Sequence, residues 1–490
     1  MNICIRALAL CLAFGACAAA SPQEKAGSEE AAAIMAEAPQ EELPPVSYER
    51  HAAYMSANRG FFEPEKPLRR AEAAQLLCNV VGIEPETLEQ SGYLDVSPAD
   101  WCYGVVCAAA EYFEPDELNE PDEPEAQAQE PRYFRPKDAA LVCELQRALG
   151  RALGGEDVSL PDGLQETEVL TRADAAVLVN RALGRTPDRE ELAAVSYDLL
   201  LDVPKTDARY YDILEAVLPH EYEQDGGERW NPETTELSPL REGAHTKDGF
   251  GYVVDETGCV IRKSGLFDFD GWTYLSDSDT GRILADGALH PVDGQVCYTL
   301  RGGQLLKDGA YGEYRFDENG FYTTGDEAID ALLDEAIAAC TTEDMTQEER
   351  LRACYEYVRS YKYLGRNAAL GQDVKTPPYE QLLGYAEKIL STGKGDCYIF
   401  AASFCLLARR LGFEAACVIG DCTYVWSWRP IAHGWVEITR GEQTLLYDPQ
   451  IENYNNRAGI SNDDYGAFGV TYETAHARYL KHGSEKETQL

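Results

Sequence analysis

The chain has 490 residues, more than one hydrophobic core usually supports, so several domains are expected. Its 44% apolar and 26% charged residues are ordinary for a globular protein, but 85 acidic residues against 43 basic ones give a formal net charge of -42. Because nucleic acids and anionic membrane surfaces also carry negative charge, this balance argues against both as partners.

The N-terminus has the pattern of an export signal, which we assign to residues 1–20. Arg6 is the only charge in the first 23 residues, Ala7–Phe14 is apolar, and Ala18–Ala20 offers a cleavage site before Ser21. The apolar stretch is too short to span a membrane as a stable helix, and no later segment reaches 18 uninterrupted apolar residues. We therefore predict an exported protein without a membrane span.

Phe14-Gly15-Ala16-Cys17 resembles a lipobox, which implies a lipid anchor at Cys17 on a bacterial cell surface. Free secretion after cleavage is the alternative. Residues 21–47 are rich in Ala, Glu, Gln and Pro, and they predict a disordered tether.

Cysteine usage allows two interpretations. Three of the 15 cysteines lie in the signal region, and in an exported protein the other twelve can form disulfides. Their spacing follows no disulfide framework, however, and four lie at apolar positions of helical patterns, as small buried residues do. No two Cys-x-x-Cys motifs lie close together, so we predict no metal site. The four cysteines at apolar helical positions are Cys78, Cys107, Cys143 and Cys405.

Residues 48–225 contain an internal repeat of short helical segments. Arg69–Glu72 and Thr171–Asp174 each open an apolar helical run, and Leu-Asp-Val recurs at 94–96 and 201–203. One domain of short capped helices would explain this pattern without any ligand. We expect helices over Ala73–Val81, Val105–Ala110, Ala139–Leu149, Ala175–Leu183 and Ile213–Leu218.

These residues resemble S-layer homology modules, about three of them, with Glu114–Pro131 as a flexible acidic insertion. The resemblance implies helical modules packed as a pseudo-threefold unit that binds an anionic cell-wall polymer. The family's binding signature is Thr-Arg-Ala-Glu, so the resemblance assigns polymer contacts to Arg70 and Arg172. Trp101, which follows the first Leu-Asp-Val segment, is a further candidate.

Residues 240–327 alternate short apolar segments with Gly- and Asp-containing turns, which predicts β-hairpins. Gly312–Gly320 resembles a choline- or glucan-binding repeat, and the resemblance implies aromatic cages for ligands. Trp272 is the candidate aromatic residue of such a cage. The alternative is a spacer that holds the C-terminal module away from the cell wall.

A cysteine stands at the start of a predicted helix in the C-terminal third. Gly393–Cys397 precedes Tyr398–Leu411, an unbroken run of apolar residues and helix formers that ends at Gly412. The unpaired amides and the dipole at a helix N-terminus stabilise a thiolate and can hold an oxyanion. Cys397 is therefore a candidate nucleophile.

A base and a residue that orients it stand on the predicted hairpin that follows. Ala432–Ile438 and Thr444–Pro449 are apolar strands joined by a short turn, with His433 near the start of the first and Asp448 near the end of the second. Antiparallel pairing brings these two residues to the same edge of the sheet. Cys397 on a helix packed against that sheet would complete a Cys-His-Asp arrangement. A buried thiol, a core histidine and a turn aspartate are the alternatives.

The same residues resemble the core of the transglutaminase-like family, in the order Gly-x-Cys, a helix ending in Leu-Gly, a Val strand, His-x-Trp and aromatic-Asp-Pro, within residues 329–480. The resemblance implies an α+β papain-like fold without a cofactor. It assigns Cys397 as nucleophile, His433 as base and Asp448 as orienter. Some animal members need calcium, but no segment here resembles a dedicated calcium loop.

The predicted architecture is multidomain, with helical S-layer homology-like modules, a β-hairpin repeat spacer and an α+β papain-like transglutaminase core. Attack by Cys397 on an amide carbonyl would give a thioester, which water or a primary amine can resolve. We expect a cell-surface peptidase or amidase acting on a peptide or protein substrate such as cell-wall peptides. A cross-linking acyl transferase and a catalytically silent surface binding module are the alternatives.

Overall fold

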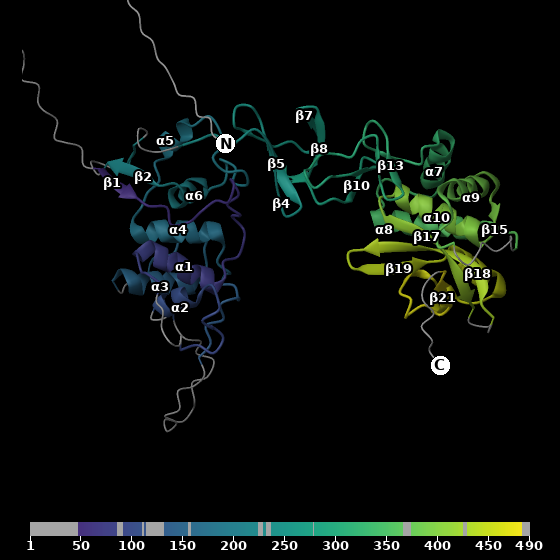
Figure 1. The fold of residues 1–490 in the computed structure, drawn as a ribbon, viewed down its shortest axis with the longest axis horizontal. Helices are drawn as coiled ribbons and strands as arrows, with labels where there is room; N and C mark the ends of the chain where they lie inside the picture. The colour runs from purple at the N-terminus through teal and green to yellow at the C-terminus, as the bar shows by residue number, and fades with distance from the viewer. Residues whose placement is uncertain are drawn as a thin grey trace, which may run out of the picture. The chain divides into compact units, whose positions relative to one another are not determined.

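The computed structural model describes residues 48–85, 92–109, 112–113, 132–154, 158–223, 229–231, 237–277, 279–365, 374–424 and 429–482. Figure 1 shows the fold of these residues. The predicted signal, the tether, the Cys17 anchor and the acidic insertion at 114–131 lie outside the described residues.

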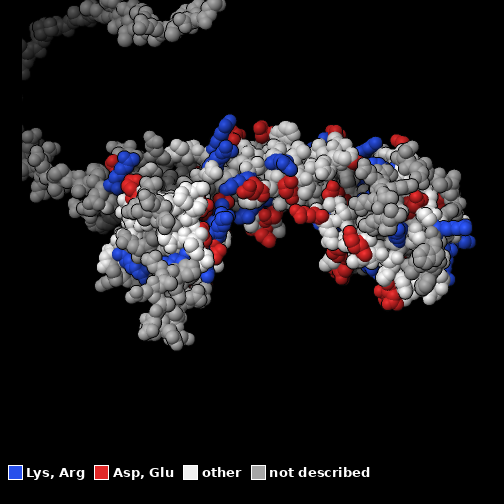
Figure 2. All heavy atoms as spheres, turned by 60° about the horizontal axis from the view of Figure 1, so that its bottom comes forward, with Lys and Arg blue, Asp and Glu red and all other residues white. Residues whose placement is uncertain are grey.

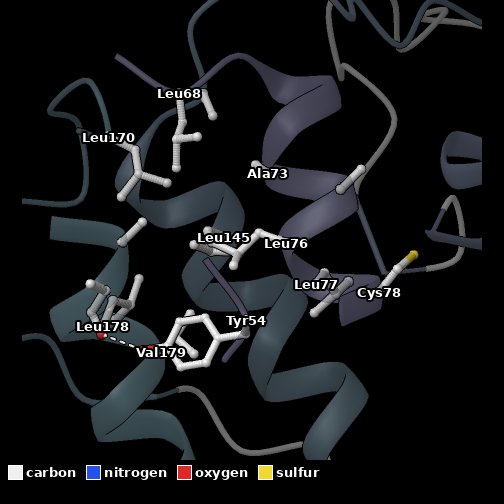
Figure 3. Packing of buried hydrophobic residues seen from close by; sticks show 14 of the residues in the cluster. Tyr54, Leu68, Ala73, Leu76, Leu77, Cys78, Leu145, Leu170, Leu178 and Val179 are labelled. Atoms are coloured by element: carbon white, nitrogen blue, oxygen red, sulfur yellow. Dashed lines mark hydrogen bonds between the residues drawn. The ribbon is translucent and has the colours of Figure 1, made fainter. Parts of the chain in front are cut away.

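The N-terminal part is built from short helices, as the repeat predicts. Its helices pack on a shared apolar core, of which Figure 3 shows Tyr54, Leu77, Leu145 and Leu178. The Arg-Ala-acid residues form the first helical turn, so the helices at residues 70 and 172 begin three residues earlier than expected. The helices are α1 (Arg70–Val81), α2 (Tyr103–Ala109), α3 (Val142–Leu153), α4 (Arg172–Leu183), α5 (Arg189–Ala194) and α6 (Tyr210–Val217). The sequence interpretation did not include α5, which Asp188 caps.

Three equivalent segments join in a closed ring of backbone hydrogen bonds at the start of α1, α3 and α4. The amide of Leu68 donates to the Leu170 carbonyl, that of Ala140 to Leu68, and that of Leu170 to Ala140, at 2.8–2.9 Å. The ring therefore repeats the same backbone contact at the starts of three helices. The S-layer homology assignment itself stays a prediction.

A small sheet closes this part of the chain. It has the strand order β1 (Tyr48–His51), β2 (His220–Glu223) and β3 (Arg229–Trp230), so the first and last segments of the helical part lie beside each other. The amides of Tyr54 and Met55 both donate to the carbonyl of Ala216 in α6, at 3.1 and 3.0 Å. The chain that follows β1 is therefore fixed to α6.

Residues 243–323 form the expected hairpins. Asp248, Asp270 and Asp293 have positive φ, and each is followed by a glycine that also has positive φ. An Asp-Gly pair of this kind suits the two-residue turn that matches the twist of a hairpin. The hairpin pairs are β4 (Gly243–Lys247) with β5 (Phe250–Val254), β7 (Gly265–Phe269) with β8 (Trp272–Ser276), and β10 (Leu289–Val292) with β11 (Gln295–Tyr298).

The remaining strands of this region are short. β6 (Val260–Ile261) and β9 (Ile283–Leu284) complete the sheet that contains β4, β5, β7 and β8. β12 (Gly309–Tyr311), β13 (Tyr314–Phe316) and β14 (Tyr322–Thr323) form a separate sheet. The Tyr314 hydroxyl donates to the Phe413 carbonyl at 2.8 Å and accepts from the Ala415 amide at 2.7 Å. This last sheet is therefore attached to the backbone of the C-terminal part.

The C-terminal part has helices on a five-stranded antiparallel sheet with the order β20-β19-β18-β17-β21. Figure 1 shows α7 to α10 on one face of this sheet. The strands are β17 (Glu414–Thr423), β18 (Ile431–Arg440), β19 (Gln443–Tyr447), β20 (Phe468–Val470) and β21 (Arg478–Lys481). The helices are α7 (Glu327–Cys340), α8 (Gln347–Arg359), α9 (Tyr379–Thr392), α10 (Cys397–Arg410), α11 (Pro449–Ala458) and α12 (Asn462–Tyr465).

The sequence interpretation also did not include α9, which follows Pro377 and Pro378. Pro378 is the N-cap of α9. A proline is tolerated there because it lacks only the backbone N–H, and the N–H groups at a helix start have no partner within the helix. The helix buries Leu382, Ala386 and Ile389, which recur at helical spacing. α9 then leads through β16 (Lys394–Gly395) into α10.

Charged side chains of both signs share the face of the molecule that Figure 2 draws. Figure 2 shows Lys and Arg interspersed with Asp and Glu on the face that it draws. None of the helices among the described residues is long and apolar enough to cross a membrane.

Candidate active site

Cys397 is the first residue of α10, as the sequence predicts. The carboxylate of Asp396 caps the helix, and its Oδ1 accepts from the amides of Tyr398 and Ile399 at 3.0 and 3.2 Å. The Cys397 side chain is buried, with 4% exposed. The thiol therefore lies at the positive end of a buried helix, and the Cys397 amide points out of the same first turn.

A glycine allows α10 to approach the sheet at this point. A Cβ added to Gly434 would lie 2.9 Å from Cδ1 and 3.4 Å from Cα of Tyr398, the residue after the cysteine. Gly434 pairs with Ile419 in the β17–β18 ladder, and its neighbour His433 pairs with Gly420. The glycine of the His-Gly-Trp motif thus brings the strand that carries His433 close to the start of the Cys397 helix.

His433 and Asp448 form a buried pair. His433 Nε2 lies 2.6 Å from Asp448 Oδ2, and the two residues are 1% and 0% exposed. The β18–β19 ladder includes the pair Val436–Tyr447, and Asp448 follows directly where β19 ends. Asp448 therefore lies diagonally from His433 on one side of the sheet.

The charge on His433 depends on its two neighbours. Burial disfavours the imidazolium, but the Asp448 carboxylate, with a smaller contribution from the neighbouring Cys397 thiol, outweighs burial and raises the pKa of His433 to about 10. Because Asp448 occupies Nε2, Nδ1 is the nitrogen left for the thiol. The structure thus brings all three predicted residues together, with the histidine between the other two.

Asp448 also makes contacts besides the one to His433. Its position before Pro449 suggested a turn residue, which accounts for only some of these contacts. Its Oδ1 accepts from the amides of Gln450 and Ile451 at 3.1 and 3.0 Å, so it also caps α11. Its Oδ2 accepts from the hydroxyl of Tyr479 at 2.9 Å. The turn-residue interpretation and the catalytic one are therefore compatible, because the two oxygens have different partners.

Sequence reasoning missed Tyr479. This residue lies on β21, which pairs with β17 at Cys422, and it is 31 positions away from Asp448. Burial, together with the Asp448 charge, raises the pKa of Tyr479 well above its usual value, so the hydroxyl keeps its hydrogen and donates. An aromatic residue near the end of the chain gave no local signal of this contact.

Comparison with known proteins supports the assignment of this part of the chain. Residues 334–449 match the transglutaminase-like superfamily. The matched segment contains Cys397, His433 and Asp448, whereas Tyr479 lies beyond its end. The transglutaminase-like domain indicates a cysteine-dependent enzyme. The comparison with curated proteins finds no match.

Among solved structures, the matches fall on small parts of the chain. A choline-binding domain from Streptococcus pneumoniae is 22% identical over 17% of this chain and 95% of its own, with a TM-score of 0.15. Choline binding protein F from the same organism, in the presence of a peptidoglycan analogue, is 15% identical over 21% of this chain and 30% of its own, with a TM-score of 0.15. An alternansucrase in complex with isomaltononaose is 18% identical over 21% of this chain and 9% of its own, with a TM-score of 0.13. Scores this low carry no argument about a ligand.

The residues predicted to bind wall polymer lie outside the transglutaminase-like domain. Arg70 is buried, its Nε donates to the Phe134 carbonyl at 2.6 Å, and its guanidinium pairs with Glu144. Arg172 donates in the same way to the Phe62 carbonyl at 2.7 Å. Both arginines join one module to another, so their guanidinium groups are already engaged within the protein.

The two tryptophans among these predicted residues are exposed. Trp101 is 66% exposed and Trp272, at the start of β8, is 54% exposed. Their exposure leaves them accessible to a ligand, but single exposed aromatic residues are common on protein surfaces. Ligand binding by these two residues stays a prediction.

Proposed function

We propose that the transglutaminase-like domain hydrolyses amide bonds of peptide or protein substrates through a thioester on Cys397. The observation that carries this proposal is the position of His433, which contacts the Cys397 thiol on one side and Asp448 on the other. A nucleophile, a base and an orienting carboxylate in this order are what acyl transfer through a cysteine requires.

The reaction begins with transfer of the thiol proton to His433, which gives a thiolate and an imidazolium. The raised pKa of His433, about 10, favours the imidazolium at neutral pH. The thiolate attacks the amide carbon, and the C–O π electrons move to the oxygen as the S–C bond forms. The Cys397 amide and the positive end of α10 are placed to stabilise this oxyanion.

Collapse of the tetrahedral intermediate breaks the C–N bond. His433 gives its proton to the leaving nitrogen, so an amine departs and a thioester remains on Cys397. Water then attacks the thioester with His433 as base, and the acid leaves as the thiol is restored. Asp448 and its two α11 amide contacts keep the ring oriented through both steps.

Hydrolysis is preferred over transfer to an amine because water reaches a thioester without a second binding site. A cross-linking enzyme must also hold the amine substrate next to the acyl-enzyme. We propose further that the chain is exported and acts on surface or cell-wall peptides, a setting that follows from the sequence of its first 20 residues.

A thiol-reactive fluorogenic probe tests the nucleophile. Wild-type protein should be labelled rapidly at one site, and Cys397→Ala should lose this labelling. Cys405→Ala is the matched control, because Cys405 is a fully buried cysteine on the same helix. Rapid labelling that persists in Cys397→Ala would rule out Cys397 as the nucleophile.

A peptide library incubated with and without a primary amine, and analysed by mass spectrometry, tests the reaction. Hydrolysis predicts cleaved peptides or free acids in both samples, and none with Cys397→Ala. Amine adducts that replace these acids would instead establish acyl transfer. An unchanged library, together with an unreactive Cys397, would favour a binding module.

A further inference from the structure

Outside the Cys-His-Asp site, three side chains with metal-binding atoms meet in the helical part. His51 comes from β1, Glu215 from α6 and His220 from β2, and their ligand atoms all lie within 4.8 Å of one another. β1 and β2 are neighbours in the small sheet, as Figure 1 shows. Glu215 and His220 are 0% and 2% exposed, and no other such group occurs among the described residues.

The hydrogen bonds of His220 define which of its nitrogens faces the carboxylate. Nδ1 lies 2.9 Å from the Leu218 carbonyl oxygen, which can only accept, so Nδ1 carries a hydrogen. Nε2 lies 3.2 Å from Glu215 Oε2. In a neutral ring with this tautomer, the Nε2 lone pair faces a carboxylate oxygen. Two acceptors at this distance require a positive charge between them, either a proton or a metal ion.

His51 approaches the other oxygen of the same carboxylate. Its Nδ1 lies 2.8 Å from Glu215 Oε1, and the two imidazole rings meet edge to face with their centroids 5.0 Å apart. One buried carboxylate thus has an imidazole nitrogen at each of its oxygens. The three donor atoms come from three separate elements and lie within 4.8 Å of one another.

We propose that His51, Glu215 and His220 bind one zinc ion, or a similar divalent transition metal. Two imidazoles and one carboxylate are a donor set that zinc favours, with a fourth position for water or another group. Histidines that bind a metal usually donate their other ring N–H to a nearby acceptor. The Leu218 carbonyl is such an acceptor for His220, and it fixes the tautomer and the orientation of the ring. The Trp230 ring stacks on the His220 ring with their centroids 3.8 Å apart, which restricts the orientation of the imidazole.

The metal would fasten the two ends of the helical part to each other. His51 and Glu215 are 164 positions apart, so no spacing motif announces the site, and the cysteine pattern that argued against a metal does not bear on it. A bound ion would add to the hydrogen bonds that already join the chain after β1 to Ala216. We therefore expect metal to raise the thermal stability of the protein.

The test uses the full chain, stripped with a chelator, titrated with Zn²⁺ and then desalted. Metal content should reach one zinc per chain, and the melting temperature should rise. The same result is expected in Cys397→Ala, which removes the thiol of the candidate active site as a possible source of zinc binding. His51→Ala changes the most exposed of the three ligands and should weaken zinc binding by about tenfold or more.

Two variants guard against misinterpretation. His290→Ala is the matched control, because His290 pairs with Asp286 at 2.9 Å outside the cluster, and its zinc binding should equal that of the wild type. Glu215→Gln keeps the side-chain size and removes the charge, so it should lose zinc binding while circular dichroism shows a folded chain. If His51→Ala does not fold, the zinc binding of Glu215→Gln tests the proposal in its place.

Substitution with Co²⁺ gives a readout of the ligands themselves. The visible absorption of a cobalt site with low coordination should appear in the wild type, Cys397→Ala and His290→Ala, and be lost in His51→Ala. Zinc uptake that disappears in Cys397→Ala but persists in His51→Ala would overturn the proposal. A stripped wild-type chain that takes up no metal would also overturn it, because hydrogen bonds alone would then link Glu215 to the two histidines.

Discussion

The hydroxyl of Tyr479 donates to Asp448 Oδ2 at 2.9 Å, the same oxygen that lies 2.6 Å from His433 Nε2. One carboxylate oxygen therefore holds the imidazole of the candidate site and a tyrosine of β21 together. The Tyr479 hydroxyl is bonded to Asp448, so its role would be to position this carboxylate.

Tyr479→Phe removes this donor and keeps the ring. The unfolding free energy should fall by about 0.5–1.5 kcal/mol, the usual contribution of one buried hydrogen bond. Because Asp448 is then less firmly placed, kcat should fall severalfold with KM little changed. Steady-state kinetics and denaturant unfolding measure the two effects. Tyr472→Phe is the control, since Tyr472 contacts Trp435 and Glu437 and leaves Asp448 alone. Equal losses of kcat in both variants would contradict a positioning role.

Asp448→Asn keeps the shape of the side chain and its capacity to cap α11 through one oxygen. The new amide would donate to His433 Nε2, so the ring hydrogen would move to Nδ1, the nitrogen that must accept the thiol proton. By analogy with the Ser-His-Asp triad, kcat should fall by roughly 10²- to 10⁴-fold. Activity within a few-fold of wild type would show that Asp448 is structural only.

The pKa of His433 predicts how stability depends on pH. Its folded value of about 10 lies above its ordinary value of 6.5, so the imidazolium stabilises the folded state fully below pH 6.5. This contribution is lost as the pH rises through about 10. The difference in unfolding free energy between wild type and Asp448→Asn should therefore shrink from pH 6.5 to pH 10. Denaturant unfolding at a series of pH values measures it, and a difference that grows with pH would contradict the predicted charge.

Gly434→Ala places a Cβ 2.9 Å from a ring carbon of Tyr398. Relief of this contact should shift the start of α10 and lower kcat, with a loss of about 1–3 kcal/mol in stability. Gly384→Ala is the control, because Gly384 lies in α9 and an added Cβ meets no atom within 4 Å. That variant should gain about 0.5–1 kcal/mol and keep its activity. If both variants behave alike, close approach at Gly434 is not what positions Cys397.

Cys340 and Cys354 should form a disulfide when the protein is treated with oxidised glutathione. Their sulfur atoms lie 3.7 Å apart at the end of α7 and within α8. Each disulfide formed reduces one oxidised glutathione to two thiols, and the chain loses two hydrogens. Such a bond should add about 2–4 kcal/mol of stability. Peptide mass spectrometry should find the linked pair in wild type and not in Cys354→Ala. A chain that carries only glutathione on Cys340 would contradict this expectation.

The sequence by itself determined the local features of the candidate site. Asp396 and the apolar run after it place Cys397 at a helix start, because a carboxylate cap and a buried helical face depend on neighbouring residues alone. The alternation of apolar residues around His433 and before Asp448 determined a hairpin and, through it, the register of the two residues. The Asp-Gly turns of the hairpin region followed from the same kind of short-range rule.

Only the tertiary structure decided the contacts that join distant segments. Tyr479 reaches Asp448 because β21 pairs with β17, and His51 meets Glu215 because β1 lies beside β2. Arg70 belongs to a segment that resembles a binding signature, but its side chain is buried against Phe134. The residues next to Arg70 in the sequence do not reveal this contact. The physical reason is common to all three: which surfaces pack depends on the shape and burial of whole elements, and no short stretch of sequence encodes it.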